Sequence, residues 1–131
     1  MTQRGFTLFE MLIALSIISI LSTIAYPLYQ SYTLKARRID AEVALIAAAA
    51  SLERYYSMHD TYEGATLEGL YVNGYSQNDY YQLSLNNLSQ GDYLVLAKPL
   101  GNQTQDNCGE LGINQLGEKT VSTTADVTGC W

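Results

Sequence analysis

An apolar run without any charged residue, residues 11–34, is the feature that most constrains what this chain can fold into. A transmembrane helix needs about 20 predominantly apolar residues, so this run is long enough to cross a bilayer. Glu10 lies at its N-terminal edge and is the one charged residue of the apolar block. Because a carboxylate at membrane depth costs roughly 2.5–3.5 kcal/mol on insertion scales, we expect Glu10 to have a partner or a function.

Residues 1–5 form a short polar segment that ends in Arg4 and Gly5. A secretory signal instead has an apolar core of about 7–15 residues with a small-residue cleavage site after it. Here the apolar core is too long, and no such site follows it. The anchor is therefore expected to stay on the mature protein, either as an uncleaved signal anchor or after a cut at Gly5–Phe6.

The apolar run contains one proline and several hydroxyl side chains. Pro27 cannot donate a backbone hydrogen bond, so it predicts a kink or a local opening of the helix. The hydroxyls of Ser16, Ser19, Ser22 and Thr23 are expected to bond carbonyls of the preceding turn or groups of a neighbouring helix.

Two indicators disagree about the side of the membrane on which the C-terminal part lies. Lys35, Arg37 and Arg38 follow the run, and the positive-inside rule would place them in the cytoplasm. Cys108 and Cys130 are an even pair near one end of an anchored chain, which favours a disulfide and an oxidising compartment. Such a bridge would add roughly 3 kcal/mol of stability, whereas the alternative is two unrelated buried thiols.

The net charge of −6 is carried by the C-terminal half of the chain. Residues 61–131 contain two lysines against eight acidic residues, while residues 1–60 are balanced. Nonspecific nucleic-acid binding depends on lysine and arginine side chains that displace counterions. The acidic distal half therefore argues against nonspecific nucleic-acid binding there.

Beyond residue 34 the pattern changes to that of an amphipathic helix. Apolar residues recur at spacings of three and four, as expected for one helical face. They are Ala36, Ile39, Val43, Ile46 and Ala50. We therefore predict one helix of roughly 50 residues, from about Phe6 to about Tyr56, whose second half packs through this face.

Four short segments with alternating apolar and polar residues predict strands. They are residues 80–85, 93–98, 111–114 and 119–122. Residues 57–78 are predicted to form a loop, in which Asn73-Gly74 is a turn signal that could close a small hairpin. The sheet is expected to be an antiparallel meander with one face toward the apolar helix face. The predicted fold class is thus α+β, with a long N-terminal α-helix packed on a four-stranded antiparallel meander sheet.

No constellation of residues indicates an enzyme, a metal site or a cofactor. His59 is the only histidine, so it forms neither a zinc cluster nor a triad, and a surface or helix-end position is expected. Phosphate-binding and nucleophile-elbow motifs are absent. Asp106, Asn107 and Glu110 lie beside Cys108 but lack the spacing of an EF-hand calcium loop. The eleven tyrosines could stack on nucleotides or sugars, although half-buried positions are the more ordinary explanation.

A more specific pattern surrounds the start of the apolar run. It is Gly5-Phe6-Thr7-Leu8-Phe9-Glu10 followed by Met11-Leu12-Ile13-Ala14-Leu15, with Pro27 seventeen residues past Glu10. This pattern resembles the class III signal of type IV pilins, the N-methylphenylalanine pilins. The run from Asp106 to Trp131, with its two cysteines, resembles PilE-type minor pilins of Gram-negative bacteria, some of which are related to a DNA-uptake receptor. The predicted helix, loop and meander agree with the pilin fold.

The resemblance implies a role for each residue of the pattern. A prepilin peptidase would cut after Gly5 and methylate the new α-amine of Phe6. Glu10 would face the N-terminal amine of a neighbouring subunit, which makes an orphan carboxylate a paired charge. Pro27 would mark the region where the helix opens as the subunit passes from membrane to filament. The two cysteines would pin the C-terminal region of the head through a disulfide.

The resemblance also implies the domain organisation. Residues 1–5 would be the leader peptide, residues 6–34 the hydrophobic transmembrane and assembly half of the helix, and residues 35–131 a periplasmic globular head. The precursor would lie in the inner membrane with a single span, and the assembled subunit in the extracellular pilus. This orientation settles the topology conflict in favour of the cysteines. Implied partners are other pilin subunits, a prepilin peptidase and the inner-membrane assembly platform, without a cofactor.

The implied function is that of a structural, minor subunit of a type IV pilus, incorporated through packing of the N-terminal helix. Such a subunit would support pilus assembly, twitching motility, adhesion or DNA uptake. The alternatives are a type II secretion pseudopilin, which shares the N-terminal chemistry, and a pilus-tip DNA-uptake receptor. Related receptors use a basic surface, so the acidic head does not indicate nucleic-acid binding.

Overall fold

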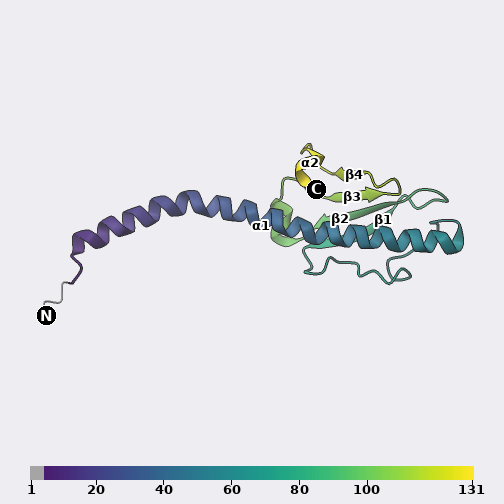
Figure 1. The fold of residues 1–131 in the computed structure, drawn as a ribbon, viewed down its shortest axis with the longest axis horizontal. Coiled ribbons are helices and arrows are strands. Elements are labelled where there is room, and N and C mark those ends of the chain that lie inside the picture. Colours follow the sequence, from purple (N-terminus) through teal and green to yellow (C-terminus); the bar gives the residue numbers. More distant parts are fainter. Residues whose placement is uncertain (1–4) are drawn as a thin grey trace. The chain divides into compact units, whose positions relative to one another are not determined.

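The computed structural model describes residues 5–131, and residues 1–4, most of the predicted leader, lie outside the described residues. The chain divides into two units that meet between Thr33 and Leu34. The elements in chain order are the helix α1 (Leu8–His59), the strands β1 (Tyr81–Asn86) and β2 (Leu94–Pro99), the 3-10 helix η1 (Gly101–Gln105), the strands β3 (Leu111–Asn114) and β4 (Lys119–Val121), and the short helix α2 (Val127–Cys130) (Figure 1).

Helix α1 contains 52 residues and belongs to both units. It begins and ends slightly later than the predicted bounds of about 6 and 56. The helix is continuous through Pro27, and a kink or an opening at this proline stays a prediction. Asp60 ends the helix with a positive φ of 57°, and its amide donates to Tyr56 O at 2.8 Å. A left-handed residue at this position is a common way for a helix to end.

Hydroxyl side chains in the first half of α1 bond carbonyls of the preceding turn, as predicted. Ser16 and Ser22 donate to the carbonyl four residues earlier, each at 2.8 Å. Ser19 and Thr23 donate to the carbonyl three residues earlier, at 2.8 and 2.7 Å. These hydroxyls therefore need no water, which suits a helix inside a bilayer.

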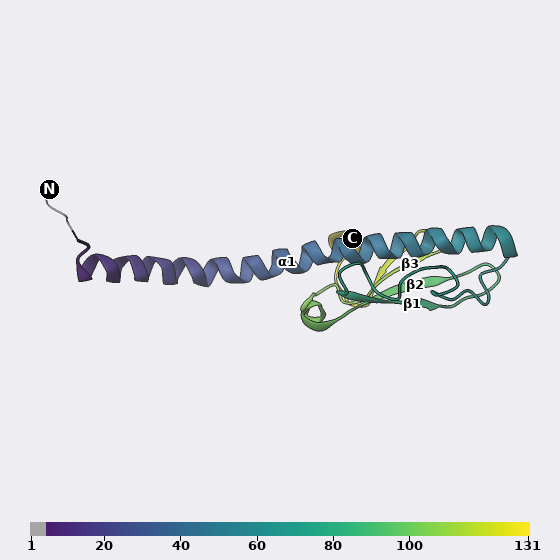
Figure 2. The same ribbon diagram turned by 90° about the horizontal axis from the view of Figure 1, so that it is seen from below.

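The strands form one antiparallel sheet in the order β1-β2-β3-β4, which is the predicted meander. β3 has the predicted bounds, β1 and β2 each begin and end one residue later than predicted, and β4 ends one residue earlier. The sheet lies along the second half of α1, as Figures 1 and 2 show. The predicted fold class is therefore confirmed.

The prediction of the α1 face that packs on the sheet was wrong. Ile39, Val43 and Ile46 are exposed by 59%, 58% and 55%. The face that enters the core is lined by fully buried residues. They are Ala41, Leu45, Ala48 and Leu52. The predicted stripe therefore points away from the core of the head.

The two faces differ in the size of their side chains. Both faces of this part of α1 are apolar at spacings of three and four, so the spacing alone does not choose between them. The two sets are offset by two positions, which is about 200° around an α-helix. The buried face carries the small side chains of Ala41 and Ala48, whereas the exposed face carries the branched side chains of Ile39, Val43 and Ile46.

The loop between α1 and β1 does not contain the small hairpin that Asn73-Gly74 suggested. Instead, Leu83 N donates to Gly74 O at 2.8 Å, and Tyr75 forms an isolated bridge with Gln82. The loop thus pairs briefly with the outer edge of β1. An edge strand otherwise presents unpaired backbone groups, so this pairing protects it.

Two side-chain contacts tie this loop to α1. The carboxylate of Asp40 accepts from the backbone amide and from Nδ2 of Asn78, both at 3.1 Å. At the other end of the loop, Tyr62 OH donates to Glu53 Oε1 at 3.0 Å. Burial, with a smaller contribution from Glu53, raises the pKa of Tyr62 to about 12. The loop is therefore fixed to the helix at both of its ends.

Candidate functional site

The segment that precedes the apolar helix folds as a capping box. Thr7 directly precedes α1, and its backbone amide and hydroxyl both lie 2.8 Å from Glu10 Oε2. The amide of Glu10 in turn donates to Thr7 Oγ1 at 3.2 Å. These contacts satisfy donors that have no partner within the helix, and they place the carboxylate at the positive end of the helix dipole.

This role of Glu10 was not predicted, although the sequence carries its signal. A Thr followed three residues later by a Glu, just before an apolar run, is the pattern of a capping box. The carboxylate therefore has a partner within its own chain. Since a carboxylate can accept about four hydrogen bonds, acceptor positions remain for an ammonium group.

The predicted processing site is exposed. Gly5 is exposed, and Phe6 is exposed by 85%. A Cβ atom built on Gly5 would meet no atom of this chain within 4 Å. Packing among the described residues therefore does not require glycine at this position.

The first unit exposes its apolar side chains along the whole helix. Examples are Phe9, Leu12, Ile17, Leu21 and Ile24, each exposed by more than half. Among the described residues, α1 is the one helix that is long and apolar enough to cross a membrane. An apolar surface of this extent requires lipid or another protein to cover it.

Two of the three basic residues after the span are engaged by the head. Arg38 Nε lies 2.7 Å from Asp106 Oδ2, and the two side chains are only 13% and 3% exposed. The guanidinium of Arg37 lies over the ring of Tyr80, 4.5 Å from its centroid. Lys35 is exposed. The basic cluster that follows the span is therefore partly a structural element of the head.

Cys108 and Cys130 form a disulfide, as predicted, and both are 4% exposed. The bridge joins the loop after η1 to α2. Asp106, one of the residues considered for calcium, directs its carboxylate to Arg38 and to the amide of Cys108. In the part of the chain that the structure describes, no group of three or more His, Cys, Asp or Glu side chains could hold a metal ion.

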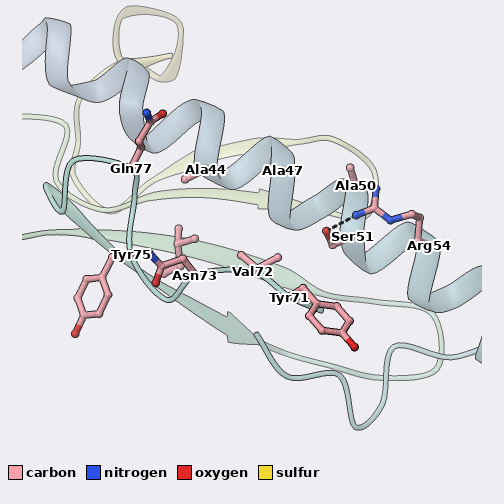
Figure 3. Close-up of a pocket in the computed structure, with 11 residues that line it drawn as sticks. Ala44, Ala47, Ala50, Ser51, Arg54, Tyr71, Val72, Asn73, Tyr75 and Gln77 are labelled. Carbon is pink, nitrogen blue, oxygen red and sulfur yellow. Dashed lines mark hydrogen bonds between the residues drawn. The ribbon is translucent and has the colours of Figure 1, made fainter. Parts of the chain in front are cut away.

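A groove lies between α1 and the loop that precedes β1 (Figure 3). Its volume is about 410 Å³, and a neighbouring hollow of about 480 Å³ shares Ser51, Arg54 and Tyr71 with it. Arg54 is the only charged residue that lines either hollow, and it donates to Ser51 Oγ at 2.7 Å. Tyr71 and Tyr75 are 98% and 43% exposed. The groove therefore offers one positive charge and two aromatic rings.

His59 and the remaining head tyrosines have structural positions. His59 is exposed in the last turn of α1 and stacks on Tyr55 with 4.1 Å between ring centroids, which confirms the predicted helix-end position. Tyr81 and Tyr93 are buried, and burial raises the pKa of Tyr81 to about 12. The expectation of half-buried tyrosines holds for Tyr55, Tyr56 and Tyr80, whereas Tyr71 is almost fully exposed.

Comparison with known protein families gives two matches. Residues 1–26 match the prokaryotic N-terminal methylation motif. Residues 27–112 match the family described as type IV minor pilin ComP, DNA uptake sequence receptor. The two matches adjoin, so together they cover the apolar helix and most of the head.

Several characterised relatives are pilins. The chain is 29% identical over 144 residues to the type IV major pilin protein PilE of Neisseria gonorrhoeae, which covers 97% of this chain and 85% of the relative. It is 36% identical over 62 residues to a fimbrial protein of Neisseria meningitidis serogroup B, covering 47% of this chain and 36% of the relative. A fimbrial protein of Pseudomonas aeruginosa is 46% identical over 50 residues, covering 37% and 32%. The chain thus matches about a third of the length of these last two.

Solved structures show the same fold. The non-core minor pilin PilV of Neisseria meningitidis aligns with a TM-score of 0.60 at 23% identity, over 73% of this chain and 93% of that one. A type IV pilin from Shewanella oneidensis aligns with a TM-score of 0.54 at 27% identity, over 75% and 97%. The chain therefore shares the fold of both structures over about three quarters of its length.

An N-terminal methylation motif, a long apolar helix and an antiparallel sheet on its second half define a type IV pilin. Pilins are structural proteins. The chain belongs to the family of the type IV minor pilin ComP.

Proposed function

We propose that this chain is a minor structural subunit of a type IV pilus and that it is incorporated through packing of α1. The exposure of apolar side chains on both halves of this helix carries the proposal. In the first unit nearly every apolar residue is exposed, and in the second Ile39, Val43 and Ile46 are exposed. In a filament, the helices of neighbouring subunits would cover both sets.

Processing would precede assembly. A prepilin peptidase is proposed to cut the exposed Gly5–Phe6 bond and to methylate the α-amine of Phe6, which the match to the methylation motif supports. The inner-membrane assembly platform would then extract the subunit, and α1 would open near Pro27 at that step. Measuring the N-terminal mass of the mature protein tests the first part, because a methylated Phe6 is expected at the N-terminus.

Glu10 is proposed to pair with the new N-terminal amine of a neighbouring subunit. Inside an apolar helix bundle, an ammonium next to a carboxylate is a paired charge, and loss of one partner leaves the other uncompensated. The contacts with Thr7 use one carboxylate oxygen and hold it at the helix end. The capping box would therefore orient Glu10 for this second contact.

The head is proposed to face the periplasm before assembly. The Cys108–Cys130 disulfide supports an oxidising compartment. The basic residues after the span would argue for the cytoplasm, but Arg38 is paired with Asp106 and Arg37 lies on an aromatic ring. These contacts give the two arginines a structural reason to be present that is independent of topology.

A gene deletion tests the role as a pilus subunit. Fewer pili, or pili with impaired retraction and twitching motility, are expected. Loss of exoprotein secretion with intact pili would instead identify a type II pseudopilin. Normal pili, motility and secretion together would contradict both assignments.

DNA binding is the second candidate function, and the family match over residues 27–112 favours it. In the groove, Arg54 could contact a phosphate, while Tyr71 and Tyr75 could stack on bases. The net charge of −6 opposes DNA binding over the rest of the head. Binding is therefore proposed to be confined to the groove.

A gel-shift with the full chain in detergent, at several salt concentrations, tests this role. Arg54→Gln is expected to weaken DNA binding and to lower the slope of log K against log salt by about one. Lys98→Gln removes an exposed lysine that does not line the groove and serves as the matched control. Absence of salt-sensitive binding by the unaltered chain would remove this candidate and leave the pilus-subunit proposal intact.

A further inference from the structure

A cluster of polar side chains is buried where α1 joins the head. Tyr81, Gln103 and Asp106 are exposed by 0%, 1% and 6%; Gln103 bonds to the other two, and Asp106 pairs with Arg38. Arg38 belongs to α1 and Tyr81 to β1. Gln103 belongs to η1, and Asp106 directly follows η1. Polar and charged groups at this depth are unfavourable unless they are paired, so their contacts are informative about the role of the cluster.

Gln103 ties η1 to the backbone of α1. Its Nε2 lies 3.0 Å from Leu34 O, 2.9 Å from Tyr81 OH and 3.1 Å from Asp106 Oδ2. An amide nitrogen carries two hydrogens, so it donates to two of these acceptors at a time. Turning the amide round would place its oxygen against a carbonyl and a carboxylate, so the nitrogen is favoured at this position. Gln103 is therefore a fixed donor beneath the first turn of α1 in the head.

Arg38 connects the two ends of the disulfide. Its Nε forms an ion pair with Asp106 Oδ2 at 2.7 Å, without the alignment of a hydrogen bond, and its Nη1 donates to Gly129 O at 3.0 Å. Asp106 Oδ1 accepts from the amide of Cys108 at 3.1 Å. Gly129 directly precedes Cys130. One guanidinium on α1 thus contacts the immediate neighbourhood of both cysteines.

We propose that the Cys108–Cys130 disulfide and Arg38 form a redox-sensitive latch that fixes the C-terminal region to α1. With the disulfide closed, the acceptors at Asp106 and Gly129 are held together on one guanidinium. With the disulfide open, α2 keeps its contacts with β4 but is no longer joined covalently to the loop that carries Asp106. Arg38 then loses the fixed spacing of its two acceptors.

The other side-chain hydrogen bonds of the described C-terminal segment do not involve α1. Trp131 Nε1 donates to Thr120 O at 3.2 Å, and Thr123 Oγ1 donates to Asn107 O at 2.7 Å. The hydrogen bond from Arg38 to Gly129 carries a charge, and among the described residues it is the side-chain hydrogen bond that joins this segment to α1. It is therefore the contact through which the state of the disulfide reaches α1.

Reduction by a thiol such as glutathione opens the latch. Two glutathione thiols lose two electrons and form one glutathione disulfide, while the protein S–S bond breaks and each cysteine Sγ gains one proton. Coupling between two sites is reciprocal, so whatever the disulfide contributes to the Arg38 contacts, Arg38 contributes equally to the disulfide. Removing the Arg38 contacts must therefore make the disulfide easier to reduce.

A redox titration of the full chain in detergent tests this coupling. The protein is equilibrated in a series of glutathione buffers that differ in the ratio of the squared concentration of reduced glutathione to the concentration of oxidised glutathione. Free thiols are then alkylated, and the fractions of oxidised and reduced protein are measured by mass spectrometry. Arg38→Gln is expected to become half-reduced at a ratio about tenfold lower than the unaltered chain, the size of one lost hydrogen bond to a charged group. An unchanged midpoint would overturn the proposal.

Arg37→Gln is the matched control. Arg37 is the neighbouring residue on α1 and contacts Tyr80 rather than the disulfide region. Its substitution should leave the redox midpoint where it is. An equal shift in both variants would show a general effect of lost positive charge and would also overturn the latch.

A second measurement needs no variant and so does not depend on whether Arg38→Gln folds. Hydrogen exchange of the unaltered chain is compared with the disulfide closed and reduced. Exchange is expected to rise at residues 34–41 of α1 and to rise less at residues 42–52, which are held by the core. Equal exchange at residues 34–41 in both redox states would refute the latch without bearing on the role as a pilus subunit.

Discussion

The two halves of α1 are one continuous helix but are stabilised in opposite ways. In the first unit the apolar side chains are exposed, and the polar contacts join residues three or four positions apart. In the second unit one face of the helix is buried in the core of the head, and the contact from Arg38 to Gly129 joins residues 91 positions apart. The first half can therefore be understood from local sequence, whereas the second depends on the fold of the head.

This contrast predicts that changes in the first half affect processing and assembly, and that changes in the head affect stability. The largest effect is expected from Gly5→Val, which should leave nearly all of the protein as an uncleaved precursor in the inner membrane. A side chain here touches nothing in the chain itself, so the loss arises at the peptidase. The intact mass of the membrane-bound protein measures it.

Gly91→Val is the control for this experiment. A Cβ atom at Gly91 also meets no atom within 4 Å, and this glycine lies in the head. The variant should be cleaved and methylated normally. Cleavage of Gly5→Val at the usual rate would show that the processing site is placed incorrectly.

Glu10 is the next test, because it has one partner inside the chain and one proposed outside it. Glu10→Val and Glu10→Gln should both be cleaved and yet be excluded from filaments, since an uncompensated buried ammonium costs about 3–5 kcal/mol. Thr7→Val removes the capping hydroxyl but keeps the carboxylate, so it should still be incorporated. The ratio of subunit in sheared pili to subunit in membranes measures the outcome.

The opposite pattern would be equally informative. Gln can replace Glu in a capping box. If Glu10→Gln assembled normally while Thr7→Val failed, helix capping rather than charge pairing would be the function of Glu10.

Neighbouring residues on opposite faces of α1 give a sharper comparison within the head. Leu45 is fully buried, and Leu45→Ala should lower the free energy of unfolding by about 2–5 kcal/mol. Ile46 is 55% exposed, and Ile46→Ala should change the free energy of unfolding by less than about 0.5 kcal/mol. The same substitution should reduce incorporation into filaments. Denaturant unfolding of the full chain in detergent measures both free energies. Equal losses would mean that the helix face is assigned incorrectly.

A weaker effect is expected at alkaline pH. The pKa values of Tyr62 and Tyr81 are raised to about 12, mainly by burial, from the usual tyrosine value of 10.0. Each neutral phenol therefore contributes stability that is complete below the unfolded pKa and is lost as pH rises through the folded value. The free energy of unfolding should therefore decrease as pH rises from the unfolded pKa of 10.0 to the folded pKa of about 12. Tyr62→Phe should reduce this dependence, and an identical dependence in the variant would contradict it.

The comparison of the two halves also shows what could be predicted from the sequence. The processing pattern around Gly5 and Glu10 consists of adjacent residues, so it was recognised directly, and the strands followed from their alternation. The capping box of Thr7 was equally visible but was overlooked. Its pattern, a Thr three residues before Glu10, is local and requires no knowledge of the fold.

Two features of the head could not be predicted in this way. The buried face of α1 was misassigned because both faces are apolar at the same spacing, so the local pattern does not choose between them. The contact of Arg38 with Gly129 joins residues far apart in sequence, so no local pattern announces it. Arg38 was therefore interpreted only as a charge after the span, although it is largely buried.

The smallest predicted effect concerns the cap of α2. Asp126 accepts from the hydroxyl and the amide of Thr128, and these bonds, the hydroxyl bond most of all, hold the pKa of Asp126 below its usual value of 3.8. A lowered folded pKa means that the cap is intact above the unfolded value and is lost as pH falls through the folded one. Amide chemical shifts of Gly129 and Trp131 should therefore change in acid, whereas Asp126→Asn should abolish that titration. Because α2 presents Gly129 to Arg38, any change should stay within the head, and a matching change in residues 8–33 would contradict the separation of the two halves.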